Sequence, residues 1–171
     1  LSAALTTYLQ QDDSAHALMV GDGSARADIE DIFEEAGMSD RLHMTGALKG
    51  QRVVDAYHAM DVFAFASLTE TQGMALAEAL AAGRPVVALD APGAHEIIQD
   101  RENGRLVAQQ DVEDFARAIA DAMQETEEDP DALAQRCRQS VEDYRSERCI
   151  ERALDLYADL LEESPSLPPM E

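Results

Sequence analysis

Short apolar runs alternate with segments of helical periodicity along most of the chain. The apolar runs have the length and composition of buried strands, whereas apolar residues three or four positions apart indicate helices. The runs that predict strands are 15–20, 41–46, 62–66, 86–89 and 105–108. The segments that predict helices are 1–11, 25–36, 51–60, 74–82, 94–99, 112–126, a segment beginning at 130, and 147–162. Strands that alternate with helices, followed by helices alone, predict an α/β fold with a doubly wound, mostly parallel, Rossmann-like sheet, helices on both faces and a helical C-terminal tail.

No internal repeat or linker divides this pattern, so we expect one domain over residues 1–163 and a loose, Pro-rich tail over 164–171. Local signals set several helix ends. Ser24, Asp111 and Asp129 are expected to cap the helices that follow them, and Gly37 is expected to close the helix before it.

The stretch between the strands 62–66 and 86–89 holds the most informative residues. A helix there must end before Gly83-Arg84-Pro85, so the unit is strand, helix and parallel strand. If the helix begins at Gly73, the amides of Met74 and Ala75 and the positive end of the helix dipole form a site for phosphate. Glu78 then lies roughly 7.5 Å further along the helix axis, where a carboxylate can accept hydrogen bonds from a ribose diol.

A second interpretation of the same stretch is purely structural. Thr69-Glu-Thr-Gln72 fits a capping box with Thr69 as the N-cap. This alternative places Gly73 inside the helix, at a cost of about 1 kcal/mol relative to Ala. The residues alone leave both interpretations open.

Charge excludes several classes of partner. The chain has 35 acidic and 13 basic residues, a formal net charge of −22, and Lys49 as its only lysine. Such a surface repels nucleic acid and anionic lipid, so we expect neither nucleic-acid binding nor membrane contact from this domain. The acids are scattered along the chain, which argues against a disordered acidic extension. The acid-rich, lysine-poor and alanine-rich composition looks like that of proteins from salt-loving organisms. Cys137 and Cys149 are expected to be unpaired thiols in a cytoplasmic protein, since no signal segment or run of 18 apolar residues occurs.

Common catalytic motifs are absent. Gly21-x-Gly23 follows a strand, but Arg26 occupies the place of the third glycine, which disfavours NAD binding. No nucleophile elbow, zincin helix or Cys pair with metal-ligand spacing occurs. Among the histidines, His95 follows a turn at the edge where open α/β sheets bind ligands. A backbone-amide pocket with a few placed carboxylates remains, an arrangement suited to a nucleotide-linked sugar.

The order of several segments resembles the C-terminal, donor-binding domain of retaining GT-B glycosyltransferases of family four (glycosyl transferases group 1). The matching segments are Val20–Gly23, Leu42–Gly46, Ala59–Phe63, Thr69–Gly73, Glu78–Leu80, Ala82–Val87 and Glu102–Gly104. The two acids of a Glu-x7-Glu signature fall at Glu70 and Glu78.

The resemblance implies a role for each residue of the central stretch. Glu70 would be the catalytic-site residue facing the donor sugar hydroxyls, with the backbone of Gln72 and Gly73 beside it. The amides of Met74 and Ala75 would hold the diphosphate.

The resemblance also implies the surroundings of the donor. Glu78 would bind the ribose diol, Leu48 would lie beside the base, and Gly21 and Gly23 would border the pocket. The reaction would transfer a hexose from a nucleotide-diphosphate sugar with retention of configuration, without a metal or cofactor, to an acceptor that is a sugar or a lipid-linked molecule.

One departure from the family pattern matters. The family has a further strand before the first helix, ending in a loop with an Arg and a Lys for the diphosphate, and an N-terminal acceptor domain. The sequence opens in that helix, so we expect a gap in the sheet and a fragment that is inactive alone. The alternatives are a sugar-nucleotide epimerase of GT-B architecture, for which His95 and Glu96 offer the ionisable groups, and a non-catalytic Rossmann-like binding module.

Overall fold

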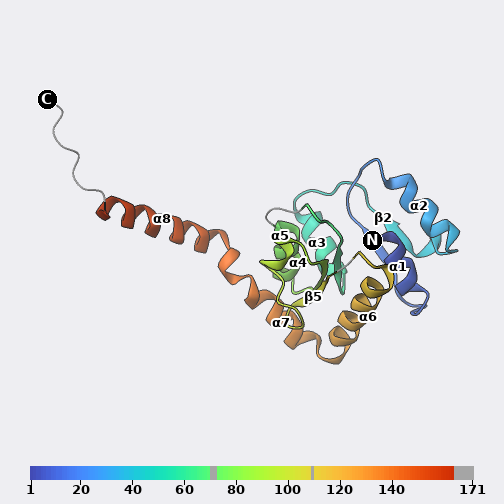
Figure 1. Cartoon of the computed structure of the whole chain (residues 1–171). Coiled ribbons are helices and arrows are strands. Elements are labelled where there is room, and N and C mark those ends of the chain that lie inside the picture. The colour runs from blue at the N-terminus through green and yellow to red at the C-terminus, as the bar shows by residue number, and fades with distance from the viewer. Residues whose placement is uncertain (70–72, 109, 164–171) are drawn as a thin grey trace.

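A computed structural model describes residues 1–69, 73–108 and 110–163. Helices and strands alternate up to β5, and helices follow (Figure 1). The strands are β1 (Ala17–Met19), β2 (Leu42–Met44), β3 (Phe63–Phe65), β4 (Val86–Leu89) and β5 (Gly104–Val107). The α-helices are α1 (Ser2–Leu9), α2 (Arg26–Glu35), α3 (Gln51–Ala59), α4 (Met74–Ala81), α5 (Pro92–His95), α6 (Val112–Glu128), α7 (Pro130–Ser140) and α8 (Ser146–Glu163). Short 3-10 helices cover Ser39–Arg41 and Glu142–Tyr144. Every strand and helix expected from the sequence therefore has a counterpart, but several bounds differ. Most strands are shorter than expected, α6 and α8 are longer, and α5 begins two residues before the expected range.

The strands pair in parallel, as the strand–helix–strand pattern predicts, but they form two separate sheets. One sheet contains β1 and β2, and the other has the order β3-β4-β5. The gap in the sheet that we expected thus separates β1 from β3. Because the strands of each sheet are parallel, their carboxyl ends, and the loops that follow them, lie at the same edge of that sheet.

Helices cover both faces of the sheet that contains β4. Val87 and Leu89 of β4 join a hydrophobic cluster with α1, α2 and α6, whereas Val86 and Ala88 join another cluster with α4, α5 and α7. All of β4 is buried. Because β4 is buried on both faces, its sequence is apolar at every position. Helices on both faces of a parallel sheet confirm the doubly wound fold class.

Caps set several helix starts. The Asp111 carboxylate accepts from the amide of Asp114 at 2.9 Å, and Asp129 accepts from the amide of Ala132 at 3.1 Å, as expected. The prediction for Ser24 is wrong, because α2 begins after Ala25 and has no side-chain cap. Gly37 adopts a φ of 70°, the left-handed conformation that closes many helices.

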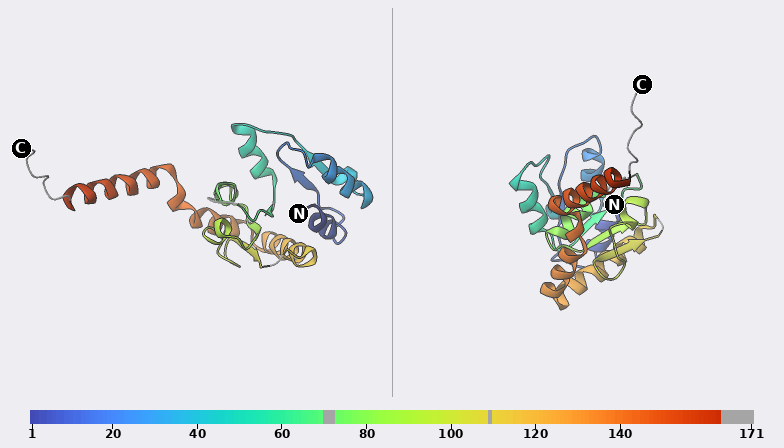
Figure 2. Two further views of the ribbon diagram at one scale, coloured as in Figure 1. Left: turned by 45° about the horizontal axis from the view of Figure 1, so that its top comes forward. Right: turned by 90° about the vertical axis from the view of Figure 1, so that its left-hand side faces the viewer.

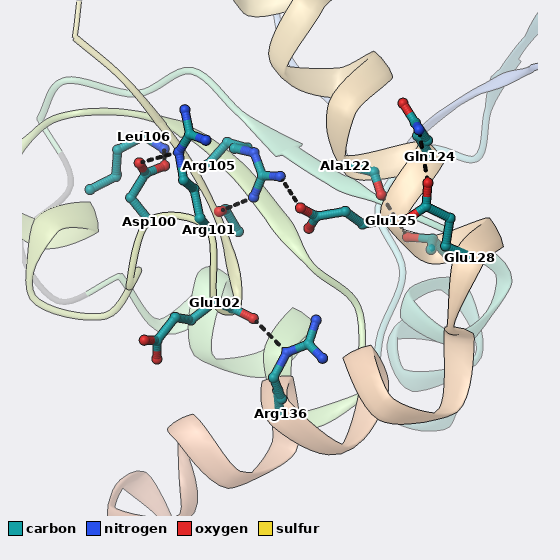
Figure 3. A network of polar contacts seen from close by, with 12 residues as sticks. Asp100, Arg101, Glu102, Arg105, Leu106, Ala122, Gln124, Glu125, Glu128 and Arg136 are labelled. Atoms are coloured by element: carbon teal, nitrogen blue, oxygen red, sulfur yellow. Dashed lines mark hydrogen bonds and ion pairs between the residues drawn. The ribbon is translucent and has the colours of Figure 1, made fainter.

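Polar contacts attach β5 to its neighbours (Figure 3). Arg105 of β5 forms an ion pair with Glu125 of α6, and the Asp100 carboxylate accepts from the Leu106 amide at 3.1 Å. Arg136 of α7 donates to the Glu102 carbonyl at 3.2 Å. These contacts attach the edge strand β5 to α6, and the turn before it to α7.

The α8 helix leaves this body and extends away from it (Figures 1 and 2). Apolar side chains along it are exposed, among them Ile150, Leu154 and Tyr157. Cys137 on α7 is a buried free thiol and Cys149 on α8 is an exposed one, so the expectation of unpaired cysteines is confirmed.

Candidate functional site

The turn before α4 decides between the two interpretations of the central stretch. Gly73 is the N-cap of α4 with φ 60° and ψ 25°, and Met74 is the first helical residue. The capping-box interpretation, with Thr69 as N-cap, is therefore wrong, and the interpretation in which the helix begins at Gly73 is confirmed. A Cβ atom on Gly73 would lie 2.7 Å from the Gly93 carbonyl oxygen and 2.6 Å from Ile97 Cδ1. Glycine is required both by the left-handed conformation and by this close approach to the loop that follows β4.

The start of α4 presents two main-chain donors. The Gly73 carbonyl accepts from the amides of Leu76 and Ala77 at 2.9 and 3.1 Å. The amides of Met74 and Ala75 precede any intrahelical acceptor, so they point out of the helix end together with the positive end of its dipole. The Met74 side chain is 48% exposed and Ala75 is half-buried. Solvent therefore reaches this helix end.

Glu78 is exposed on α4, and its carboxylate has a fixed partner. The Tyr57 hydroxyl of α3 donates to Glu78 Oε2 at 3.0 Å. Burial of the ring raises the pKa of Tyr57 above its ordinary value, and the hydrogen bond to Glu78 and the Glu78 charge raise it further. The hydroxyl is thus a permanent donor that orients one carboxylate oxygen. Sequence analysis did not single out Tyr57, because only the apposition of α3 and α4 reveals its role.

The remaining predicted residues lie on the other sheet. The Gly21 amide donates to the Gly46 carbonyl at 3.0 Å, which joins the loops that follow β1 and β2. Gly23 is exposed in the first loop, and Leu48 is half-buried in the second loop before α3. Gly21, Gly23 and Leu48 thus lie in the loops that follow β1 and β2. Gly73, Met74, Ala75 and Glu78 lie at the start of α4 and along it, between β3 and β4. The Tyr57–Glu78 contact joins α3, which follows the second of these loops, to α4.

An ionisable pair lies at the same edge. His95 Nδ1 is 3.0 Å from Asp90 Oδ1, and the His95 side chain is 71% exposed and the Asp90 side chain 40%. Asp90 follows β4 directly, and the neighbouring Gly93 carbonyl packs against Gly73. His95 was expected at this edge from the sequence, but its Asp90 partner was not.

Two expected site residues, Glu70 and Gln72, lie outside the described residues, so their roles stay predictions. Within the described ranges, no group of three or more His, Cys, Asp and Glu side chains is placed to hold a metal ion. The helices in those ranges include none with the length and apolarity needed to span a membrane.

The parallel strands and the helices around them define a doubly wound α/β domain, and the comparison with known proteins defines the family. Residues 1–125 match the family described as glycosyl transferases group 1, and the chain belongs to this family. The resemblance to this family that the sequence indicated is confirmed, and so is the GT-B fold.

Relatives and solved structures agree with this assignment. The chain is 28% identical over 158 residues to alpha-monoglucosyldiacylglycerol synthase of Streptococcus pneumoniae, covering 92% of this chain and 35% of that protein. It is 32% identical over 135 residues to a GDP-mannose-dependent alpha-mannosyltransferase of Mycobacterium tuberculosis, covering 79% of this chain and 33% of that protein. The crystal structure of the pneumococcal O-GlcNAc transferase GtfA in complex with UDP and GlcNAc has a similar fold, with a TM-score of 0.77, 19% identity, and coverage of 94% of this chain and 32% of that chain. The chain thus spans about a third of the length of these proteins.

Proposed function

We propose that the chain is the donor-binding half of a retaining glycosyltransferase that transfers a hexose from a nucleotide-diphosphate sugar. The observation that carries this proposal is the helix start at Gly73, which turns the amides of Met74 and Ala75 toward the carboxyl edge of the sheet. Open α/β sheets bind their ligands at this edge, and helix N-termini bind phosphate.

The diphosphate would bind where α4 begins. Two amides and the helix dipole supply positive potential in a chain whose formal net charge is −22. The same groups would stabilise the nucleotide diphosphate as it leaves the sugar, since its charge increases in the transition state. We expect no metal ion in this step.

The ribose would bind one turn further along α4. Tyr57 donates to Glu78 Oε2, and a carboxylate has about four acceptor positions, so Glu78 retains capacity for both hydroxyls of a vicinal diol. The Tyr57 hydrogen bond supports this role because it holds the carboxylate in one orientation before the ligand arrives.

Other predicted residues complete the proposed site. Glu70 would face the sugar hydroxyls with Gln72 beside it, Leu48 would contact the base, and Gly21 and Gly23 would border the pocket. The name of one relative includes diacylglycerol, which supports a lipid-linked acceptor, and that of another includes GDP-mannose, which supports a nucleotide-sugar donor.

The test is donor binding to the complete enzyme that contains this chain. Thermal shift with UDP-, GDP- and ADP-sugars identifies the nucleotide, and calorimetry then compares Glu78→Ala with the matched control Glu35→Ala. Glu35 is an exposed helical glutamate at the end of α2. We expect Glu78→Ala to weaken binding at least about tenfold, the loss of hydrogen bonds to a charged group, and Glu35→Ala to leave it unchanged. Equal donor affinity of both variants would favour the non-catalytic binding module instead.

An epimerase is the second candidate, and the Asp90–His95 pair favours it. An imidazole hydrogen-bonded to a carboxylate can exchange protons with a sugar carbon or hydroxyl at this edge. Product analysis separates the two reactions. A transferase releases the nucleoside diphosphate and moves the sugar to an acceptor, whereas an epimerase returns a nucleotide sugar of changed configuration.

A further inference from the structure

Two histidines from neighbouring strands meet on the sheet of β1 and β2. His16 directly precedes β1, and His43 lies in the middle of β2. His16 Nδ1 and His43 Nε2 are 3.0 Å apart, although 27 positions separate the two residues in the sequence. The ring centroids are 5.0 Å apart, and both side chains are exposed. The pair lies outside the proposed donor site, so its chemistry needs an explanation of its own.

The register of the sheet places both histidines on one face. Ala17 of β1 pairs with Leu42 of β2, and Leu18 pairs with His43. Ala17 and Leu42 pack into the hydrophobic cluster that contains residues of α1, α2 and α6. Side chains alternate along a strand, so the neighbours of Ala17 and Leu42, His16 and His43 among them, face the opposite side. Parallel pairing therefore fixes which two side chains meet there.

A second contact fixes the backbone beside both histidines. The Arg41 side chain, two residues before His43, donates from Nε to the Ala15 carbonyl at 2.8 Å, and it also donates to the Asp12 carbonyl. Ala15 directly precedes His16. The segment that carries His16 is thus tied to the segment that carries His43 by the strand pairing and by Arg41. Only the side-chain rotations of the two imidazoles remain to be ordered by a ligand, and a preorganised site of this kind binds at a lower entropic cost.

The contact between the two rings contributes little to the fold. A neutral imidazole has one donor and one acceptor nitrogen, so one ring donates to the other. Water offers the same hydrogen bonds to exposed rings, so the net gain from this bond is small. What the arrangement does supply is a pair of imidazole nitrogens at a fixed separation, and imidazole is the commonest metal ligand in proteins.

The separation of the two nitrogens matches that of neighbouring ligands of one metal ion. A bond from an imidazole nitrogen to a first-row ion such as Zn²⁺ is about 2.0–2.1 Å long. Two such bonds to nitrogens 3.0 Å apart enclose an angle of about 90–97°. Neighbouring ligands enclose about 90° in square-planar and tetragonal coordination, which is typical of Cu²⁺ and Ni²⁺. The tetrahedral angle of Zn²⁺ would need nitrogens about 3.3–3.4 Å apart, so the observed separation favours Cu²⁺ and Ni²⁺.

We propose that His16 and His43 chelate a divalent transition-metal ion of the Ni²⁺ or Cu²⁺ type, which bridges β1 and β2. His16 binds through Nδ1 and His43 through Nε2, after each exposed ring has turned its lone pair toward the ion. Water completes the coordination, since the described residues offer no third His, Cys, Asp or Glu placed to join the pair. The proton between the two nitrogens moves through water to the other nitrogen of its ring, so both imidazoles stay neutral, as metal binding requires. The site lies toward the amino end of β1 and the proposed donor site lies at the carboxyl edge, so this inference does not depend on donor binding.

The acidic surface of the chain is the main competitor for such an ion. Its 35 acidic residues attract any divalent cation, Mg²⁺ and Ca²⁺ included. Imidazole suits Cu²⁺, Ni²⁺ and Zn²⁺, whereas carboxylate and water suit Mg²⁺ and Ca²⁺. An excess of Mg²⁺ therefore occupies the carboxylates and leaves the histidine pair available to Ni²⁺.

Calorimetric titration with Ni²⁺ in excess Mg²⁺, at about pH 8, tests the proposal on the complete protein that contains this chain. The variants are His16→Asn, His43→Asn and the two together, and His58→Asn is the matched control. His58 is an exposed histidine on α3. We expect each of the first two variants to weaken Ni²⁺ binding at least about tenfold, and His58→Asn to leave it unchanged. The double variant should add little, because the loss of either ligand already ends chelation.

Thermal unfolding gives a second measurement. An ion that binds only the folded state raises the melting temperature, so Ni²⁺ should stabilise the unchanged protein and His58→Asn but not the variants at His16 and His43. Gln replaces Asn in any variant whose circular dichroism spectrum departs from that of the unchanged protein. No binding of Ni²⁺ in the presence of Mg²⁺ would overturn the proposal, because the acidic surface would then account for the cation. A loss of affinity in only one of the two single variants would also overturn it, since the ion would not be shared.

Discussion

Replacement of Gly73 by alanine tests the turn on which the proposed donor site depends. The backbone at Gly73 has φ 60°, a conformation that costs an alanine roughly 1–2 kcal/mol. The new Cβ would lie 2.6 Å from Ile97 Cδ1 and 2.7 Å from the Gly93 carbonyl oxygen, whereas such contacts are normally about 3.5–4.0 Å. Ile97 can change its rotamer, but the Gly93 carbonyl belongs to the backbone of α5, so it can move only if α5 shifts. Overpacking of this kind costs about 1–3 kcal/mol.

Both costs together give an expected loss of about 3 kcal/mol in the free energy of unfolding, and a melting temperature lower by roughly 6–12 °C for a domain of this size. Gly37→Ala is the matched control. Gly37 has φ 70°, but nothing lies within 4 Å of its added Cβ, so only the conformational cost applies. Urea unfolding followed by circular dichroism measures both variants. A loss for Gly73→Ala no greater than that for Gly37→Ala would refute the close packing of the turn against the loop after β4.

Four further predictions concern Tyr57, the net charge, Asn103 and the two cysteines. Tyr57→Phe keeps the ring but removes the hydrogen bond to Glu78, so donor affinity measured by calorimetry should fall about three- to tenfold, less than for Glu78→Ala; unchanged affinity would show that Tyr57 does not position the carboxylate. Donor affinity should rise as salt increases from about 0.1 to 1 M, since screening weakens the repulsion between an anionic ligand and a chain of net charge −22, and a fall would indicate cationic partners instead. Asn103→Ala removes bonds from a buried amide to the Ile97 carbonyl, the Ser140 hydroxyl and the Gln99 amide, and urea unfolding should show a loss of about 3 kcal/mol. Burial raises the pKa of Cys137 to about 11, so at pH 8 an alkylating reagent should modify Cys149 at least about 100-fold faster than Cys137, as measured by mass spectrometry. The neutral Cys137 thiol stabilises the folded state at pH values below the pKa of the unfolded thiol, and this stabilisation is lost as the pH rises toward 11.

Much of the fold was predictable because its signals are local. Apolar runs identified all the strands, and Asp111 and Asp129 identified two helix starts because a capping side chain needs only its own first turn. Ser24 carries the same signal, but α2 begins at Arg26 without it. A residue type that favours capping therefore caps a helix only where the local backbone lets its side chain reach the amides of the first turn.

The central stretch shows where local signals stop. The sequence offered two helix starts, one capped by Thr69 and one at Gly73, and could not decide between them. In the structure, α4 begins after Gly73, and this turn packs against the Gly93 carbonyl so closely that no side chain fits at position 73. The Gly93 contact joins residues twenty positions apart, and no periodicity in the sequence records it.

Side-chain partners across elements were also beyond the sequence. Tyr57 of α3 and Glu78 of α4 come from different helices, and the Tyr57 ring packs against Phe63 of β3. Asp90 and His95 meet across the start of α5, which follows β4 closely. Polar residues are abundant in this chain, so the presence of a tyrosine or an acid gives no information about its partner. Of these four residues, only Glu78 and His95 were identified in advance. Glu78 was identified from its place along the helix after Gly73 and from the family signature, and His95 from its place after a turn at the carboxyl edge.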